Sequence, residues 1–215
     1  MVDKDRTKVH RSPAKQVFDP EVVRTITARA VLAYVAIVED GQPFCIPVVC
    51  APYKGELLLH GSSASRLFNA LAAGTPACVT ITHLQALVLA RSAFDSSMRY
   101  QSLMALGSAR PLHAEEKSEA LNALTDHLFP ERRRELRSTT KQEMQATSIL
   151  AFPLTEVSIK VSSTIPENPD PNLDAGVWVG ILPITTTYGP PIPVDDLDPG
   201  IRSPEYISRW PINRI

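Results

Sequence analysis

Three serines and an arginine stand together at positions 62, 63, 65 and 66, between an apolar run and a helical pattern. The surrounding residues 54–75 are KGELLLHGSSASRLFNALAAGT. The run after Lys54-Gly55 predicts a strand that ends at His60-Gly61, and the later apolar positions have helical spacing that Gly74 ends. Hydroxyl groups, the free N–H groups of a helix start and Arg66 would together suit an anion such as phosphate. An ordinary helix with a serine N-cap explains the same residues.

Composition and charge narrow the class of protein. The 215 residues are 44% hydrophobic and 21% charged, which is typical of a globular domain. The formal net charge of −1 gives no basic excess for nucleic acid or an anionic membrane. No apolar run approaches the roughly 18 residues that cross a bilayer, and the first residues lack the apolar core of a signal peptide. We therefore expect no nucleic-acid partner and no membrane partner.

The three cysteines, Cys45, Cys50 and Cys78, are odd in number and form no C-x-x-C pair. This pattern disfavours a disulfide framework and a structural zinc site. We expect small buried or half-buried thiols in a reducing compartment, which favours the cytoplasm. A catalytic thiol has little support.

Turn and cap residues divide the chain into short elements. Asp19-Pro20-Glu21 predicts the start of a helix. Apolar runs at 30–40 and 43–53, separated by Asp40-Gly41, predict a hairpin in which Pro47 marks an edge or a bulge. Further strands are predicted at 76–84, 86–94, 99–112 with a bulge at Gly107, 148–161 and 177–184.

Residues 114–147 have a different character from the strands around them. The pattern at 114–128 predicts an amphipathic helix that ends before Pro130. The following segment carries Arg132, Arg133, Arg134 and Arg137 interleaved with glutamates, which favours a solvated helix face with ion pairs over a nucleic-acid or phosphate site. Short strands with few helices predict an antiparallel barrel. We expect a loose leader at 1–18, one barrel domain at 19–184 and a proline-rich arm at 185–215.

Five stretches follow one another in a familiar order: DGQPFCIPVV, LLLHGSSASRLFNAL, VTITHLQALVLARSAFDSSMRYQSLMALGSA, SIKV and DAGVWVGILPI. Together they resemble the pyridoxamine 5'-phosphate oxidase-like, FMN-binding split-barrel superfamily, and within it the flavin-nucleotide-binding group that includes nitroimidazole-resistance proteins. The resemblance covers roughly residues 20–190. It implies a mainly β (α+β) fold, a six-stranded antiparallel split β-barrel with flanking helices. It also implies a homodimer with two equal FMN sites at the interface.

Matched position by position, the flavin contacts of the family fall on four segments of this chain. Those near the ring and the ribityl chain are Pro47, Val48, Val49, His60, Gly61 and Ser62; those on the phosphate are Ser65 and Arg66; and those from later strands are Tyr100, Gln101, Ser102 and Trp178. A phosphate suits a guanidinium, and a flat apolar ring suits a strand surface and an indole.

Two cations of the family pattern are displaced. The segment S-x-N-Y-R-S is here Ser97-Met98-Arg99-Tyr100-Gln101-Ser102, and the late K-V-R ends in Ser162. Arg99 and Tyr100 should point to opposite faces of a strand, so Arg99 need not reach the same phosphate. The Arg-x-His motif of the true oxidase is absent near Arg209-Trp210, so we expect no pyridoxamine phosphate oxidase activity.

The leading hypothesis is an FMN-dependent oxidoreductase, with FAD possible, that passes electrons from a reduced nicotinamide to a small electron-poor acceptor. No Rossmann fingerprint is present, so the nicotinamide would bind transiently at the open flavin face. His60 would act there as a proton or hydrogen-bond donor, unless it is a strand-end histidine bonded to a carbonyl. The alternatives are a non-enzymatic flavin store or sensor and a heme-handling split barrel. His83, His113 and His127 have no metal-like spacing.

Overall fold

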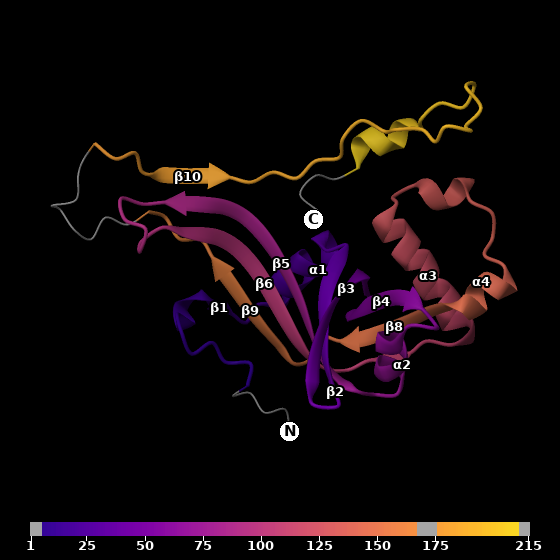
Figure 1. The fold of residues 1–215 in the computed structure, drawn as a ribbon, viewed down its shortest axis with the longest axis horizontal. Helices are drawn as coiled ribbons and strands as arrows, with labels where there is room; N and C mark the ends of the chain where they lie inside the picture. Colours follow the sequence, from indigo (N-terminus) through magenta and orange to yellow (C-terminus); the bar gives the residue numbers. More distant parts are fainter. Residues whose placement is uncertain (1–5, 167–175, 211–215) are drawn as a thin grey trace.

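Ten strands form one antiparallel sheet in the computed structural model, which describes residues 6–166 and 176–210 (Figure 1). The strand order is β1-β9-β6-β5-β2-β3-β4-β8-β7, and β10 pairs with β5 outside this path. The sheet curls around a core and carries few helices, so the expected split-barrel class is confirmed. The outer parts of the expected leader and arm lie outside the described residues.

The elements have the following bounds. The strands are β1 (Gln16–Val17), β2 (Leu32–Glu39), β3 (Gln42–Tyr53), β4 (Glu56–Ser62), β5 (Pro76–Leu89), β6 (Ser97–Ser108), β7 (Arg110–Pro111), β8 (Thr147–Pro153), β9 (Val157–Ser162) and β10 (Gly180–Pro183). The α-helices are α1 (Pro20–Arg29), α2 (Arg66–Ala72), α3 (Ala114–Leu128) and α4 (Lys141–Ala146), and the 3-10 helices are η1 (Pro13–Lys15), η2 (Arg132–Glu135) and η3 (Glu205–Arg209).

Local sequence signals explain the first helix and the first hairpin. The Asp19 side chain accepts a hydrogen bond from the Glu21 amide and so caps α1 as predicted. Asp40 and Gly41 both have positive φ, of 52° and 75°, as a type I′ hairpin turn requires. Strand β3 pairs with β4 only from Val49 onward, so Pro47 lies in an edge segment where no second strand needs its missing N–H.

Three strand predictions are corrected by the structure. The expected strands at 76–84 and 86–94 are one strand, β5, with a bulge between Leu84 and Ala86. Gly107 is not a bulge, because it pairs in register with Ala77; Pro153 lies too close to leave room for a larger side chain there. The expected strand at 148–161 is two strands, β8 and β9.

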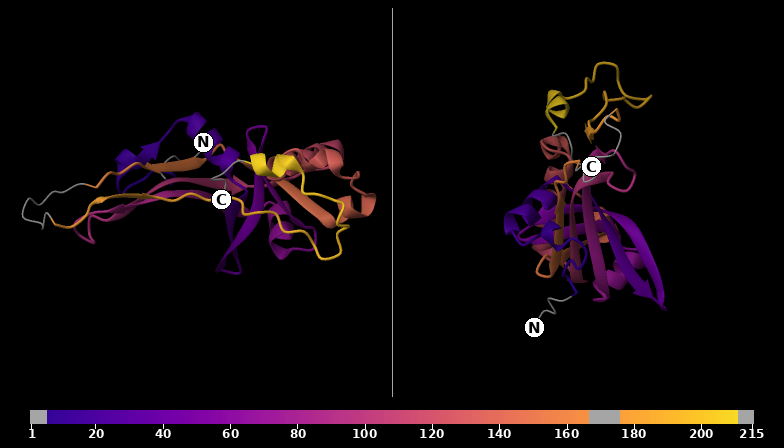
Figure 2. Two further views of the ribbon diagram at one scale, coloured as in Figure 1. Left: turned by 90° about the horizontal axis from the view of Figure 1, so that it is seen from above. Right: turned by 90° about the vertical axis from the view of Figure 1, so that its left-hand side faces the viewer.

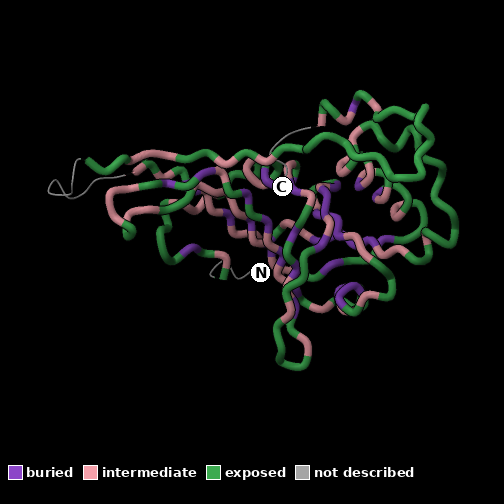
Figure 3. Tube along the Cα trace, turned by 45° about the horizontal axis from the view of Figure 1, so that its top comes forward, coloured by how far each residue is buried: buried purple, intermediate pink, exposed green. Residues whose placement is uncertain are grey.

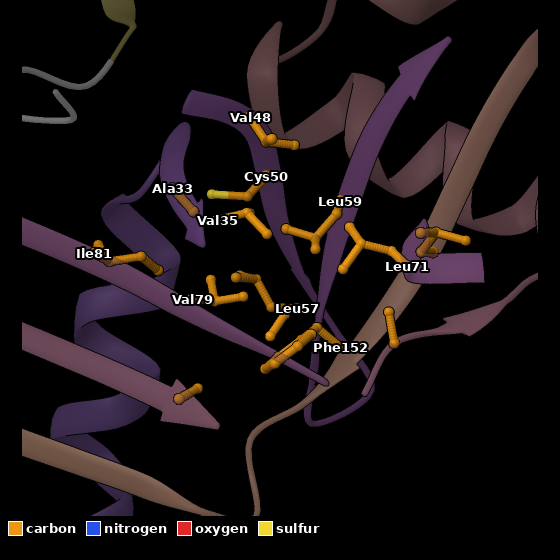
Figure 4. Close-up of a cluster of buried hydrophobic side chains, with 14 of the residues drawn as sticks. Ala33, Val35, Val48, Cys50, Leu57, Leu59, Leu71, Val79, Ile81 and Phe152 are labelled. Carbon is orange, nitrogen blue, oxygen red and sulfur yellow. The ribbon is translucent and has the colours of Figure 1, made fainter. Parts of the chain in front are cut away.

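The core is built by alternate residues of the curled sheet (Figure 4). Leu57 and Leu59 of β4 point into the main cluster, while Leu58 points to a second cluster beneath α3, with Leu124. Burying these apolar side chains contributes on the order of 1.5–3 kcal/mol each. Strand β4 is therefore covered on both faces at its three leucines, which belong to the buried part of the trace in Figure 3. The next residue, His60, is only half-buried.

Beyond the core, the outer ends of β5 and β6, with β10 beside β5, and the C-terminal arm give the chain an elongated outline (Figure 2). Strand β10 pairs with the outer half of β5, and the arm then runs back to α3. There the Trp210 indole N–H donates to the Pro130 carbonyl at 3.0 Å. The arginines near η2 pair with acids as predicted: Arg132–Glu135, Arg133–Asp126, Arg134–Glu131 and Arg137–Glu143. Two of these pairs, Arg132–Glu135 and Arg134–Glu131, are spaced i,i+3. Among the described residues, no helix is long and apolar enough to cross a membrane.

Candidate functional site

His60 is a half-buried histidine whose ring makes no hydrogen bond to any described residue. In the strand register it lies between Val49 of β3 and Ile149 of β8. Burial lowers the pKa of the His60 imidazole below its ordinary 6.5, so the ring is neutral at pH 7. A neutral imidazole with free nitrogens can accept a proton, donate a hydrogen bond or ligate a metal.

The residues around His60 share the face of the sheet that points away from the main core, which we call the outer face. Cross-strand partners in an antiparallel sheet lie on the same face, and His60 pairs with Val49, which pairs with Leu32. Two residues along, Pro47 pairs with Tyr34. Leu32 and Tyr34 are 37% and 49% exposed. The outer face therefore combines a free imidazole with an exposed apolar surface.

Two further predicted residues belong to the outer face, but on another strand. Leu84 of β5 pairs with Tyr100, and Thr82 pairs with Ser102. Leu84 is 43% exposed, as expected for this face. The sheet order places β5 and β2 between β6 and β3, so Tyr100 and Ser102 lie several strands from His60. Val48 points into the core with 5% exposure, so only its backbone can contact a ligand.

Some of the polar side chains just before α2 already form hydrogen bonds within the chain. The Ser62 hydroxyl accepts from the Ala64 amide at 3.1 Å, and the Ser63 hydroxyl donates to the Ala146 carbonyl at 3.0 Å. Ser65 occupies the N-cap position without a side-chain bond, so its hydroxyl is free. Arg66 is about half exposed, and its Nε lies 3.3 Å from a carboxylate oxygen of Glu39. Ser65 and Arg66 are thus the polar groups here that can receive an anion.

Gln101 faces the core side and meets His83 across the β5–β6 pair. The Gln101 side-chain oxygen and His83 Nδ1 are both buried without a hydrogen-bond partner among the described residues. Arg99 also lies on that side, where its Nε donates to the Thr164 carbonyl at 3.0 Å. Arg99 and Tyr100 therefore point to opposite faces, as expected from strand alternation.

Trp178 lies at the far end of the molecule from His60. It precedes β10, which pairs with β5 at residues 86–89, and its indole covers Gly180. The ring is 67% exposed. Figure 1 places β10 and α2 at opposite ends of the sheet. One chain therefore places Pro47 and Val49 beside His60, and leaves Tyr100, Ser102 and Trp178 apart from them. The residues that contact the Arg66 side chain are Glu39 and Phe44 of the β2–β3 hairpin.

An apolar cavity of about 560 Å³ lies elsewhere, between α1, the β3–β4 turn and β9. Its walls include Val23, Pro52, Leu154 and Val157, and none of the predicted site residues. No group of three or more His, Cys, Asp or Glu among the described residues could hold a metal ion.

Two residues beside Arg66 were missed from the sequence. Glu39 and Phe44 come from the β2–β3 hairpin, and the Arg66 guanidinium carbon lies 4.1 Å from the centre of the Phe44 ring. The signal available in the sequence was the turn at Asp40-Gly41, which brings the two hairpin residues together. Nothing in the sequence placed Arg66 against them.

Comparison with known proteins settles the family. The sequence model for pyridoxamine 5'-phosphate oxidase matches residues 19–161, which is more than half of the chain. The chain belongs to the pyridoxamine 5'-phosphate oxidase family. No curated protein matches it.

Two solved structures resemble the chain over nearly all its length. The FAD and heme binding protein from Mycobacterium smegmatis is 37% identical, with a TM-score of 0.86 over 91% of this chain and 96% of that one. The flavocytochrome Anf3 from Azotobacter vinelandii is 33% identical, with a TM-score of 0.87 over 95% of this chain and 96% of that one. A putative 5-nitroimidazole antibiotic resistance protein from Bacteroides thetaiotaomicron is 22% identical, with a TM-score of 0.58 over 68% of this chain and 86% of that one, and shares the fold.

Proposed function

We propose that this protein binds a flavin and a heme and transfers electrons between a reduced donor and a small acceptor. The observation that carries the proposal is the free, half-buried imidazole of His60 on the apolar outer face. The two neighbours aligned over more than nine tenths of the chain are a FAD and heme binding protein and a flavocytochrome. A family member with a spare neutral histidine fits the same pair of cofactors.

His60 is the residue that would ligate the heme iron. Histidine ligates iron in its neutral form, and burial keeps the pKa of His60 low enough for that form to prevail. The rings of His83 and His127 each already bond a backbone carbonyl, of Ile26 and Ala30 respectively, whereas the His60 ring makes no hydrogen bond to a described residue. The exposed apolar surface of Leu32 and Tyr34 on the same face suits a flat macrocycle.

Arg66 and Ser65 would hold the phosphate of the flavin, and the free backbone edge of β3 would lie beside its ring. A guanidinium binds phosphate oxygens through charge-assisted hydrogen bonds, and the free edge of β3 offers backbone groups beside Pro47. The flavin supplies the electron transfer, so the chain's own residues bind, orient and shield it.

A second copy of the chain would complete each site. In one chain, Tyr100 and Ser102 lie on the outer face but far from His60. Trp178 is also far from His60, and it is exposed. A homodimer that packs outer face against outer face brings the two groups together. The arm is consistent with this arrangement, because its apolar side chains Ile192, Val194 and Ile201 are exposed in one chain.

The test begins with spectra of the purified protein after it has been mixed with hemin and desalted. A Soret band is expected in the native protein and in His113→Ala, whose exposed ring serves as the matched control. The band is expected to vanish in His60→Ala. If no band forms, or if it survives in His60→Ala, the heme assignment fails.

Turnover separates an electron-transfer protein from a passive flavin binder. Flavin-loaded protein is mixed with excess reduced nicotinamide and a nitroaromatic or quinone. We expect continuous oxidation of the nicotinamide over many equivalents. A single bleaching of the flavin without cycling would reject the catalytic part of the proposal.

The oligomer is tested by light scattering after gel filtration. The expected mass is twice 23.6 kDa, and Trp178→Ala is expected to weaken flavin binding without unfolding the protein, since the indole is mainly exposed. A monomer that retains flavin at full affinity would overturn the shared site.

A further inference from the structure

Arg66 is held between two residues of the β2–β3 hairpin. Its Nε lies 3.3 Å from Glu39 Oε2, and its guanidinium carbon lies 4.1 Å from the centre of the Phe44 ring. The cation–π contact with Phe44 and the ion pair with Glu39 together restrain the position of the Arg66 guanidinium. The cation that would meet a flavin phosphate therefore has a carboxylate beside it already.

Rigid elements hold both partners in place. Glu39 and Gln42 are the last pair of the hairpin, closed by the two positive-φ residues Asp40 and Gly41. Phe44 packs against the main core. Arg66 is the first residue of α2, whose Leu67 and Phe68 are buried with 3% and 4% exposure. A ligand that reaches Arg66 thus meets Glu39 at a nearly fixed position.

We propose that Glu39 is a specificity-determining residue that makes the flavin site favour FAD over FMN. This inference rests on the proposed function, because it takes Arg66 as the phosphate-binding cation. Arg66 and Glu39 together are formally neutral, so the site lacks the charge to balance a dianion. The terminal phosphate of FMN carries about −1.5 to −2 charges at pH 7, as a phosphate monoester does. Each phosphate of the FAD pyrophosphate is a diester-like group with a single negative charge.

The Glu39 carboxylate discriminates between FMN and FAD because Coulomb repulsion grows with the charge of the phosphate near it. The phosphate that Arg66 contacts carries up to one more negative charge in FMN than in FAD, because FAD spreads its charge over two phosphates and the second one lies farther from Glu39. The Glu39 side chain is 35% exposed, so solvent reduces this repulsion without removing it. Removing the carboxylate should strengthen binding of both nucleotides and should favour FMN more. We expect the ratio of the two dissociation constants to move toward FMN by about tenfold at low salt, and by less at high salt.

The experiment titrates flavin-free protein with FAD, FMN and riboflavin and follows the quenching of flavin fluorescence. Glu39→Gln keeps the shape of the side chain and removes its charge. Asp40→Asn is the matched control, because it removes the same charge one residue away at an exposed turn position where asparagine tolerates the positive φ of 52°. Arg66→Gln reports whether the phosphate contributes at all.

The expected result has three parts. Glu39→Gln shifts selectivity toward FMN, Asp40→Asn leaves it unchanged, and neither variant alters riboflavin binding. In Arg66→Gln, the affinities for FAD and FMN decrease toward the affinity for riboflavin. An unchanged FAD to FMN ratio in Glu39→Gln overturns the inference, and so does an equal shift in Asp40→Asn. If the native protein binds none of the three flavins, the proposed function itself fails, which is a separate outcome.

Discussion

His83 Nε2 lies 3.0 Å from the carbonyl oxygen of Ile26, and this buried hydrogen bond ties strand β5 to helix α1. His83 is only 3% exposed. Because the carbonyl can only accept, Nε2 carries the hydrogen and Nδ1 is the unprotonated nitrogen of a neutral ring. Burial is the main cause that lowers the pKa of His83, the nearby Arg29 lowers it further, and the hydrogen bond to Ile26 opposes both.

This lowered pKa predicts a loss of stability in mild acid. The unfolded chain takes up a proton near pH 6.5, while the folded chain resists it until a lower pH. The contribution is therefore present above pH 6.5 and is lost as the pH falls through the folded pKa, at up to about 1.4 kcal/mol per pH unit. Burial lowers the pKa of His60 too, so its contribution has the same sign. Urea unfolding between pH 7.5 and pH 5 measures the slope.

His83→Gln should flatten that slope, because an amide can donate to Ile26 and does not titrate. His113→Gln is the control, since His113 is exposed, and it should leave the slope unchanged. If His83→Gln retains the full dependence on pH, His83 is not the group responsible.

Gly61 is required by packing, independently of any ligand. A Cβ at this position would lie 2.3 Å from the ring of Phe68, a side chain that is 4% exposed in the core. Gly61→Ala should therefore lower the free energy of unfolding by about 1–3 kcal/mol. Gly189→Ala is the control, because no heavy atom lies within 4 Å of its added Cβ. Chemical denaturation of the two variants makes the comparison.

A second substitution tests the cause. Adding Phe68→Leu to Gly61→Ala removes the atoms that clash, so the two changes together should cost less than the sum of the single changes. Simple additivity would mean that the alanine acts through something other than the Phe68 ring.

The sequence predicts those elements whose signals are local. Asp19 caps α1 and Asp40-Gly41 closes the hairpin, because caps and tight turns depend on a few neighbouring residues. Strand β5 was divided wrongly at Gln85, a polar residue that interrupts the apolar alternation. The structure accommodates it as a bulge within one strand, since the neighbouring β6 pairs on both sides of it.

The candidate site also has a part that local sequence signals predict and a part that they do not. That Pro47, Val49 and His60 lie together follows from the hairpin and the next strand, which are close in sequence. The contact of Arg66 with Glu39 depends on how the barrel closes, and no local pattern specifies it. Trp178 was matched to the flavin by the family pattern alone, and in one chain it lies at the far end of the sheet from His60.

Trp210 should anchor the arm to the body of the protein. Its indole donates to Pro130, and its ring lies within 6.4 Å of the ring centres of Phe129, Tyr188 and Tyr206. Trp210→Ala removes these contacts and should free the arm, so limited proteolysis between residues 185 and 204 should become faster. Ile192→Ala, at a side chain 90% exposed, is the control and should leave the rate unchanged. Equal cleavage of the native protein and Trp210→Ala would show that the anchor lies elsewhere.

Cys50 should be the unreactive thiol of the three. It is fully buried in the core, and burial raises its pKa to about 12, so almost no thiolate exists at pH 8. Cys45 is exposed and should react first with iodoacetamide. In native protein, mass spectrometry of digested samples should find Cys50 unmodified after Cys45 is fully alkylated. In 6 M guanidinium chloride the two should react at similar rates, because the burial is gone. Rapid alkylation of Cys50 in native protein would mean that the core opens often enough to expose β3, which contradicts the packing of Cys50 against Val35 and Leu59.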